Sequence, residues 1–139
     1  MSTKAEPLLS IRDLKVWFPV QRGILARTVG HIRAVDGISL DIGSGEVLGL
    51  VGESGCGKST LARAIMLLEP PHAGLICYGG RDVVSMSRLQ LRDYRRQVQI
   101  VFQDPFAALN PRRSVLEIVT EGPLQHGLIA RGEAVPACG

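Results

Sequence analysis

The feature that most constrains this chain is a glycine-rich loop at residues 52–59. Gly52, Gly57, Lys58 and Ser59 occupy the fixed positions of the pattern G-x-x-x-x-G-K-[ST], which wraps backbone amides around a polyphosphate. Glycine permits the turns and the close backbone approach that such a cradle requires. The pattern also predicts that a helix begins near Lys58, so that the unpaired N–H groups at its start face the same phosphates.

The residues on both sides of this loop fit a strand, loop and helix unit. Residues 46–51 form a short apolar run, which is typical of a strand buried on both faces of a parallel sheet. After the loop, apolar residues fall on one helical face before Pro70 and Pro71 end the helix; they are Leu61, Ala64, Ile65 and Leu68. Because both flanks agree with the motif, a glycine-rich turn that matches by chance is the minor alternative.

Composition limits the class of protein. A chain of 139 residues with 45% hydrophobic and 21% charged residues suits one soluble domain. The net charge of +3 is mild and its basic residues are interleaved with acidic ones, so we expect no nucleic-acid partner. No apolar run approaches a membrane span and the N-terminus lacks the apolar core of a signal peptide, which favours the cytoplasm. Cys56, Cys77 and Cys138 have no metal-ligand spacing, as expected in a reducing compartment.

The part of the chain before the loop predicts antiparallel strands. Residues 7–20 have strand-like alternation and include two aromatic residues, Trp17 and Phe18. Residues 21–33 have weak periodicity and predict an exposed hairpin loop or an insertion. Residues 34–42 alternate apolar and polar side chains, as a half-buried strand does. We therefore expect an antiparallel pair that leads into a parallel core.

Beyond the loop, the pattern predicts a strand, a helix and a second strand. Residues 74–78 read as a short strand. Ser87 and Gln90 have the spacing of a capping box for a basic helix that runs through Arg96; a solvated face explains its arginines better than a nucleic-acid patch does. Residues 98–102 are a β-rich run.

Gln103 follows directly after the predicted strand at residues 98–102. In open α/β sheets, ligands bind beyond the carboxyl ends of the strands. We therefore expect Gln103 to face the same nucleotide as Lys58. The alternative is a strand-end glutamine in a solvated turn.

Three segments carry a family resemblance. They are A-V-D-G-I-S-L-D-I at residues 34–42, G-E-V-L-G-L-V-G-E-S-G-C-G-K-S-T-L at 45–61, and V-Q-I-V-F-Q-D-P-F-A-A-L-N-P-R at 98–112. Together they resemble the ATP-binding subunits of ABC transporters, most closely those of oligopeptide and dipeptide importers. The resemblance covers about residues 8–128, and the third segment is much more specific than the loop alone. Sister importers for nickel and other small solutes share these segments and are the alternative.

The resemblance implies an α/β fold, with a P-loop NTPase (RecA-like) core and an antiparallel β subdomain at the N-terminus. Residues 1–128 would be the N-terminal part of an ATP-binding domain, and residues 129–139 an irregular tail outside the resemblance. The family's domains continue into an L-S-G-G-Q signature, an apolar strand that ends in Asp-Glu beside the loop's own strand, and a switch histidine. None of these occurs in the sequence, so we expect a truncated domain, from a fragment or an interrupted reading frame.

The resemblance also implies roles for individual residues. Lys58 would contact the β- and γ-phosphates, and Ser59 would ligate Mg²⁺. Gln103 would contact the metal and the attacking water, as the catalytic candidate. An aromatic residue stacks on adenine in this family; we expect Phe18, with Trp17 as the competing choice. The residues that bind the phosphates of ATP would be Gly52, Glu53, Ser54, Gly55, Cys56, Gly57, Lys58, Ser59 and Thr60.

In the intact family, this subunit hydrolyses ATP to energise solute uptake on the inner face of the plasma membrane. Its partners are membrane-spanning permease subunits and a second ATP-binding subunit. Because γ-phosphate hydrolysis needs acidic and water-orienting residues that this sequence lacks, we expect no turnover by the chain alone. A non-catalytic fragment with weak or no nucleotide binding is one alternative. A small P-loop kinase or GTPase is another, which the F-Q-D-P segment and the absence of N-K-x-D disfavour.

Overall fold

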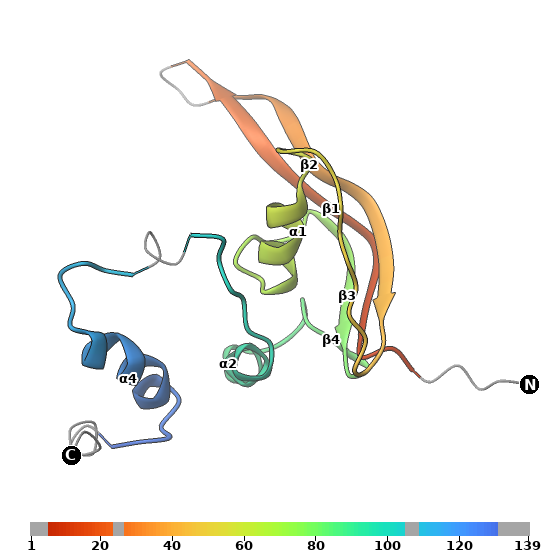
Figure 1. Ribbon diagram of the computed structural model, residues 1–139. Helices are drawn as coiled ribbons and strands as arrows, with labels where there is room; N and C mark the ends of the chain where they lie inside the picture. The colour runs from red at the N-terminus through yellow and green to blue at the C-terminus, as the bar shows by residue number, and fades with distance from the viewer. Residues whose placement is uncertain (1–5, 24–26, 105–108, 131–139) are drawn as a thin grey trace, which may run out of the picture. The chain divides into compact units, whose positions relative to one another are not determined.

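The computed structural model describes residues 6–23, 27–104 and 109–130 (Figure 1). It divides into two units, Met1–Tyr94 and Arg95–Gly139, and each is described by itself. In chain order the elements are β1 (Leu9–Arg22), β2 (Arg27–Ile42), α1 (Lys58–Ile65), β3 (Ala73–Tyr78), β4 (Arg81–Asp82), α2 (Arg88–Gln97) and α4 (Val115–Gln125).

The first unit is built on one antiparallel sheet with the strand order β2-β1-β3-β4. β1 is hydrogen-bonded on both edges, to β2 from Leu9↔Ile42 to Arg22↔Arg27 and to the shorter β3 from Leu9↔Tyr78 to Lys15↔Ala73. Figure 1 shows β1 and β2 as a long curved hairpin. The predicted antiparallel subdomain at the N-terminus is therefore confirmed.

The core of this unit lies where the sheet meets α1 and α2. The sheet contributes buried residues from three strands, and α1 contributes Leu61 and Ala64. On α2, Tyr94 is buried, its hydroxyl donates to the Ile65 carbonyl at 2.8 Å, and its ring packs edge-on against Tyr78. The buried sheet residues are Ile11, Leu14, Val16, Val35 and Ile76.

A β-bulge in the hairpin decides which way Trp17 and Phe18 face. Val16 pairs with Val35 but Trp17 pairs with Arg33, so Ala34 is an extra residue on β2. Along β1 the alternation is unbroken here, so Phe18 shares a face with buried Val16. Trp17 lies on the opposite face.

The hairpin is longer than the sequence predicts. Residues 21–33 were expected to form a loop, but β1 continues to Arg22 and β2 begins at Arg27. The prediction was wrong because several register shifts, including one between Val20 and Gln21, disturb the alternation by which a strand is recognised.

The two predicted core strands are also wrong for this structure. Residues 46–51 and 98–102 contain no strand, and Val47 and Val51 are each 95% exposed. A strand must pair its backbone groups with a neighbour, and among the described residues neither segment has one. The antiparallel subdomain is present, whereas the parallel strands of the expected core are not formed.

The predicted helices and β3 are confirmed. α1 begins at Lys58, and the Ser87–Gln90 capping box precedes α2, with backbone-to-side-chain distances of 2.9 and 3.4 Å. α1 ends earlier than the two prolines require. Leu67 adopts a left-handed φ of 49°, and the amide of Leu68 bonds back to Arg63 at 2.9 Å.

In the second unit, α4 begins with a capping box. Ser114 and Glu117 exchange hydrogen bonds, yet no residue of α4 is buried.

Across the described ranges, every helix is too short or too polar to cross a bilayer.

Candidate functional site

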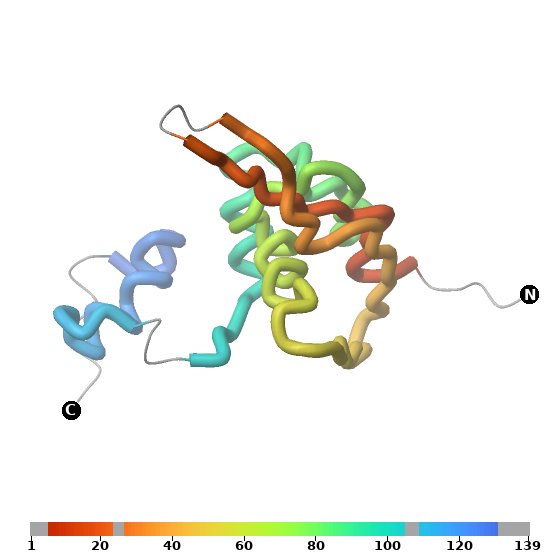
Figure 2. The backbone as a smooth tube through the Cα atoms, turned by 90° about the horizontal axis from the view of Figure 1, so that it is seen from above, coloured from red at the N-terminus to blue at the C-terminus, as the bar shows by residue number. Residues whose placement is uncertain are grey.

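The glycine-rich loop is attached to the sheet at Gly57. This residue has a φ of 93°, and a Cβ placed on it would lie 2.1 Å from the carbonyl oxygen of Ala34 on β2. Only glycine combines this conformation with so close a backbone contact. The loop therefore passes against the bulge of β2 before α1 begins, and Figure 2 shows the irregular run from β2 into α1 in yellow.

Lys58 folds back over the loop that precedes it. Its Nζ donates to the carbonyl oxygens of Gly52 at 2.7 Å and Glu53 at 2.6 Å, and it lies 3.2 Å from Cys56 Sγ. These contacts bring Gly52, Glu53 and Cys56 together around one ammonium group. A single cationic group at the centre of a backbone cradle is the arrangement that binds phosphate oxygens.

The start of α1 adds to the positive potential at this loop. Its first turn contains no acidic residue, and no side chain caps its N-terminus. The first N–H groups of a helix point out of its N-terminus, here toward the loop, and no side chain of the protein occupies them. Such a helix start favours an anion. Ser59 is exposed, and its hydroxyl makes no hydrogen bond within the described chain.

These residues suit a magnesium ion. Mg²⁺ retains most of its water and binds proteins through one or two oxygens together with substrate phosphates, so the free Ser59 hydroxyl beside the loop fits. The described residues contain no group of three or more His, Cys, Asp or Glu that could hold a metal by themselves. Ser59 is thus a fitting protein ligand only in combination with phosphate oxygens.

The predicted phosphate-binding residues of the loop differ in how far they are exposed. Gly52, Glu53, Ser54, Gly55 and Cys56 are exposed, whereas Gly57, Lys58 and Thr60 are partly buried. The close contact of Gly57 with Ala34 was not predicted from the sequence, because a backbone carbonyl in a β-bulge leaves no residue signature.

Phe18 and the loop lie on the same side of the hairpin. Val35, which pairs with Val16, has its Cγ2 3.6 Å from the position of a Cβ on Gly57. Phe18 shares that face with Val16 and is partly buried. Of the two aromatic candidates, Phe18 is therefore on the side of the sheet that carries the phosphate-loop attachment.

Trp17 is already engaged on the opposite face. Its ring stacks on His72 with 4.5 Å between centroids, and the Arg33 guanidinium lies 4.8 Å from its centroid. Its Nε1 donates to Asp36 at 3.1 Å. A nucleotide base would have to displace these groups to stack there.

Gln103, the catalytic candidate, belongs to the second unit and is exposed. The structure does not bring it into the same unit as Lys58. Residues 105–108, within the third resemblance segment at 98–112, and Cys138 lie outside the described residues.

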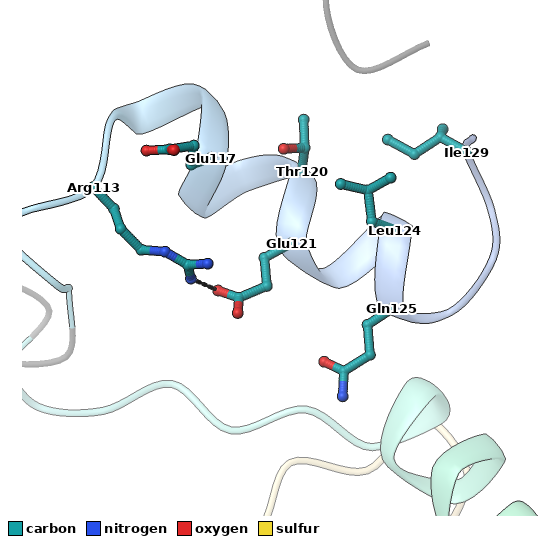
Figure 3. A pocket seen from close by; sticks show the side chains of 7 residues that line it. All are labelled: Arg113, Glu117, Thr120, Glu121, Leu124, Gln125 and Ile129. Atoms are coloured by element: carbon teal, nitrogen blue, oxygen red, sulfur yellow. Dashed lines mark hydrogen bonds and ion pairs between the residues drawn. The ribbon is translucent and has the colours of Figure 1, made fainter. Parts of the chain in front are cut away.

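The second unit has a hollow along α4, shown in Figure 3. Arg113 forms an ion pair with Glu121 across it, and Thr120 donates its hydroxyl to the helix's own Leu116 carbonyl at 2.7 Å. The lining residues are Arg113, Glu117, Thr120, Glu121, Leu124, Gln125 and Ile129. None pairs a nucleophile with a base, so we assign no chemistry to this hollow.

Similar proteins share both the sequence and the fold. An oligopeptide transport ATP-binding protein, AppF of Bacillus subtilis (strain 168), is 44% identical over 129 residues, which are 92% of this chain and 39% of AppF. The di/tripeptide transport ATP-binding protein DppF of Pseudomonas aeruginosa is 43% identical, over 92% of this chain and 39% of DppF. The glutathione import ATP-binding protein GsiA of Escherichia coli O157:H7 is 41% identical, over 94% of this chain and 21% of GsiA.

A solved dimeric ATP-binding cassette, MJ0796 bound to ADP and Pi, has a similar fold. Its TM-score is 0.69 at 23% identity, over 91% of this chain and 52% of that one. The chain thus spans about half of the cassette, and two fifths or less of these curated relatives. The fold class is therefore that of the N-terminal part of an ATP-binding cassette.

The ABC transporter family model matches residues 35–134. That match begins just after the bulge residue Ala34 and includes the glycine-rich loop and the whole of α1. The chain therefore belongs to the ABC transporter family.

Proposed function

We propose that this chain supplies the phosphate-binding part of an ATP-binding subunit in an ABC importer of peptides. The observation that carries the proposal is the loop held by Gly57 against β2, with Lys58 at its centre and an uncapped helix start behind it. The names of the relatives, which refer to transport of oligopeptides, di/tripeptides and glutathione, support the solute class. Nickel or another small solute is the alternative.

The residues would divide the nucleotide between them. Lys58 would exchange its two carbonyl partners for the β- and γ-phosphate oxygens, and the loop amides would bind the remaining oxygens. Ser59 would hold Mg²⁺, which when bound offsets the negative charge of the phosphates. Phe18 would stack on adenine, since it lies on the loop's side of the hairpin. Gln103 would approach the metal and water, as the family resemblance implies.

The partners follow from the same family. Permease subunits and a second ATP-binding subunit would complete the transporter, and the dimeric state of the MJ0796 cassette supports the latter. The protein would lie on the inner face of the plasma membrane. We propose that the residues described above bind ATP.

A second function deserves a test because one observation favours it. Residues 46–51, which lead into the loop, are irregular and exposed, so the loop lacks a strand to fix its entry. A non-catalytic fragment with weak or no nucleotide binding would result. The experiment below separates it from the main proposal.

Titration with a fluorescent ATP analogue in the presence of Mg²⁺ tests the site. We expect Lys58→Ala to weaken binding at least tenfold, because the polyphosphate loses its central cation. Lys15→Ala is the matched control: it removes the same charge from a lysine paired with Asp13 on the sheet. Equal affinity for the parent and Lys58→Ala proteins would contradict the phosphate-loop assignment, and no binding by the parent would favour the fragment.

The adenine platform is tested with the two adjacent aromatic residues. Phe18→Ala should weaken analogue binding by about 1–3 kcal/mol, because stacking of a base on an aromatic side chain usually contributes that much to the binding free energy. Trp17→Ala should leave the affinity unchanged while lowering the stability of the sheet. The reverse pattern would assign the platform to Trp17.

A further inference from the structure

Helix α2 presents a row of arginines that the proposed nucleotide site does not use. Arg88, Arg92 and Arg96 recur every four residues, so they follow one side of the helix. All three are exposed, and none has an ion pair or a side-chain hydrogen bond within the described residues. We call these three residues the arginine row.

The opposite side of α2 fixes the direction in which this row points. Tyr94 is buried there, donates to Ile65 and packs against Tyr78. On an ideal helix the three arginines lie within about 60° of the direction opposite Tyr94. The helix is therefore anchored by one face and displays its cations on the other.

A leucine and an aspartate border the row. Leu89 follows Arg88 on the solvent side of α2 and is 68% exposed. It does not share the inward face of the helix, where Tyr94 is buried. Asp93 lies on the flank, is exposed and forms no ion pair within the described part of the chain. A cluster of basic side chains is attracted to an anionic lipid surface, and each cation near that surface adds to the attraction.

We propose that α2 docks this protein on anionic phospholipid headgroups through the arginine row and Leu89. Guanidinium groups bind phosphate oxygens in a bidentate manner and give up water more readily than ammonium groups. A straight row with regular spacing suits a plane of phosphates. Leu89 favours lipid over an acidic protein or a nucleic acid, because it adds an apolar contact at the level of the headgroups.

The test is vesicle flotation of the full chain. Phosphatidylcholine vesicles are compared with vesicles that contain phosphatidylcholine and phosphatidylglycerol in a 60:40 ratio, at low and at high salt. We expect binding to the anionic vesicles at low salt and its loss at high salt, because exposed charges are screened within about 10 Å at 0.1 M. Each arginine near an anionic surface contributes about fivefold to partitioning.

Substitutions locate the binding surface. The triple variant Arg88→Gln, Arg92→Gln, Arg96→Gln should reduce partitioning at least tenfold, and the corresponding triple Arg→Lys variant should retain most of it. The control variant Arg22→Gln, Arg27→Gln, Arg63→Gln removes the same charge from other exposed positions and should bind like the parent. Circular dichroism verifies that each variant keeps its helices.

Several outcomes would overturn the proposal. They are equal loss in the two Gln triple variants, equal binding to neutral vesicles, or a parent protein that does not float. Binding of an acidic peptide or a DNA duplex that depends on the row, without flotation, would assign the row to that partner instead. Lys58→Ala should float like the parent, so a failure of the proposed nucleotide site does not affect this test.

Discussion

β1 and residues 46–51 have similar sequences and opposite structures. Both contain several Val and Leu residues, yet β1 is paired on both edges and buries Ile11, Leu14 and Val16. Residues 46–51 are irregular, with Val47 and Val51 almost completely exposed. Apolar β-prone residues therefore give a strand only where another strand accepts their backbone hydrogen bonds.

Helix α4 shows why helices differ in this respect. It buries no residue, and its start is closed by Ser114 and Glu117 alone. A helix pairs its backbone groups within itself, whereas a strand depends on a neighbour. α4 is therefore a regular helix although none of its residues is buried, whereas the exposed residues 46–51 form no regular structure.

The largest expected effect compares the two apolar segments directly. Leu14→Ala should destabilise the first unit by about 2–5 kcal/mol, because it empties a fully buried site. Val47→Ala should change the stability by less than about 0.5 kcal/mol, as surface substitutions usually do. Urea unfolding followed by circular dichroism measures both. A large effect of Val47→Ala would mean that residues 46–51 are buried in solution.

The next effect concerns the contact between the phosphate loop, which follows residues 46–51, and strand β2. Gly55 and Gly57 both have positive φ, but only Gly57 faces a backbone oxygen. Gly55→Ala should cost about 1 kcal/mol of backbone strain. Gly57→Ala should cost at least twice as much, because the Ala34 carbonyl cannot move without disturbing β2. Equal midpoints in urea for the two variants would show that the loop does not rest on the sheet.

A smaller effect is expected for the hydroxyl that ties α2 to the first unit. Tyr94→Phe removes the hydrogen bond to Ile65 and should lower the free energy of unfolding by about 1 kcal/mol. Tyr78→Phe is the matched control, since no hydrogen bond of its hydroxyl occurs within the described residues. Equal effects would mean that Tyr94 acts through its ring alone.

The smallest effect is a pH dependence at α4. Hydrogen bonds from the Ser114 backbone and side chain lower the pKa of Glu117. The cap is therefore fully present above the ordinary carboxyl pKa and is lost as the pH falls through the lowered value. The amide proton shift of Ser114, measured by NMR, should follow this titration. Glu117→Gln should abolish it, and Glu121→Gln should not; a titration unaffected by Glu117→Gln would contradict the capping role.

The sequence predicted those features whose causes are local. The start of α1 follows from Gly57 and Lys58, and the start of α2 follows from Ser87 and Gln90. The early end of α1 was not predictable, because Leu67 takes the left-handed position that glycine usually marks. The bulge at Ala34 and the absence of a strand at residues 46–51 depend on other segments. The phosphate loop was therefore predictable as a motif, while its contact with β2 was not.

Trp17 is the one tryptophan of the chain, and it lies between Arg33 of β2 and His72, whose amide bonds to Lys15 just before β3. Its fluorescence thus reports on both neighbours of β1 at once. The connection from β2 to β3 carries the whole phosphate loop, so His72 reaches the indole only after that connection has closed. Stopped-flow emission during refolding should therefore report when His72 reaches Trp17, and thereby time the closure of this connection without any added label.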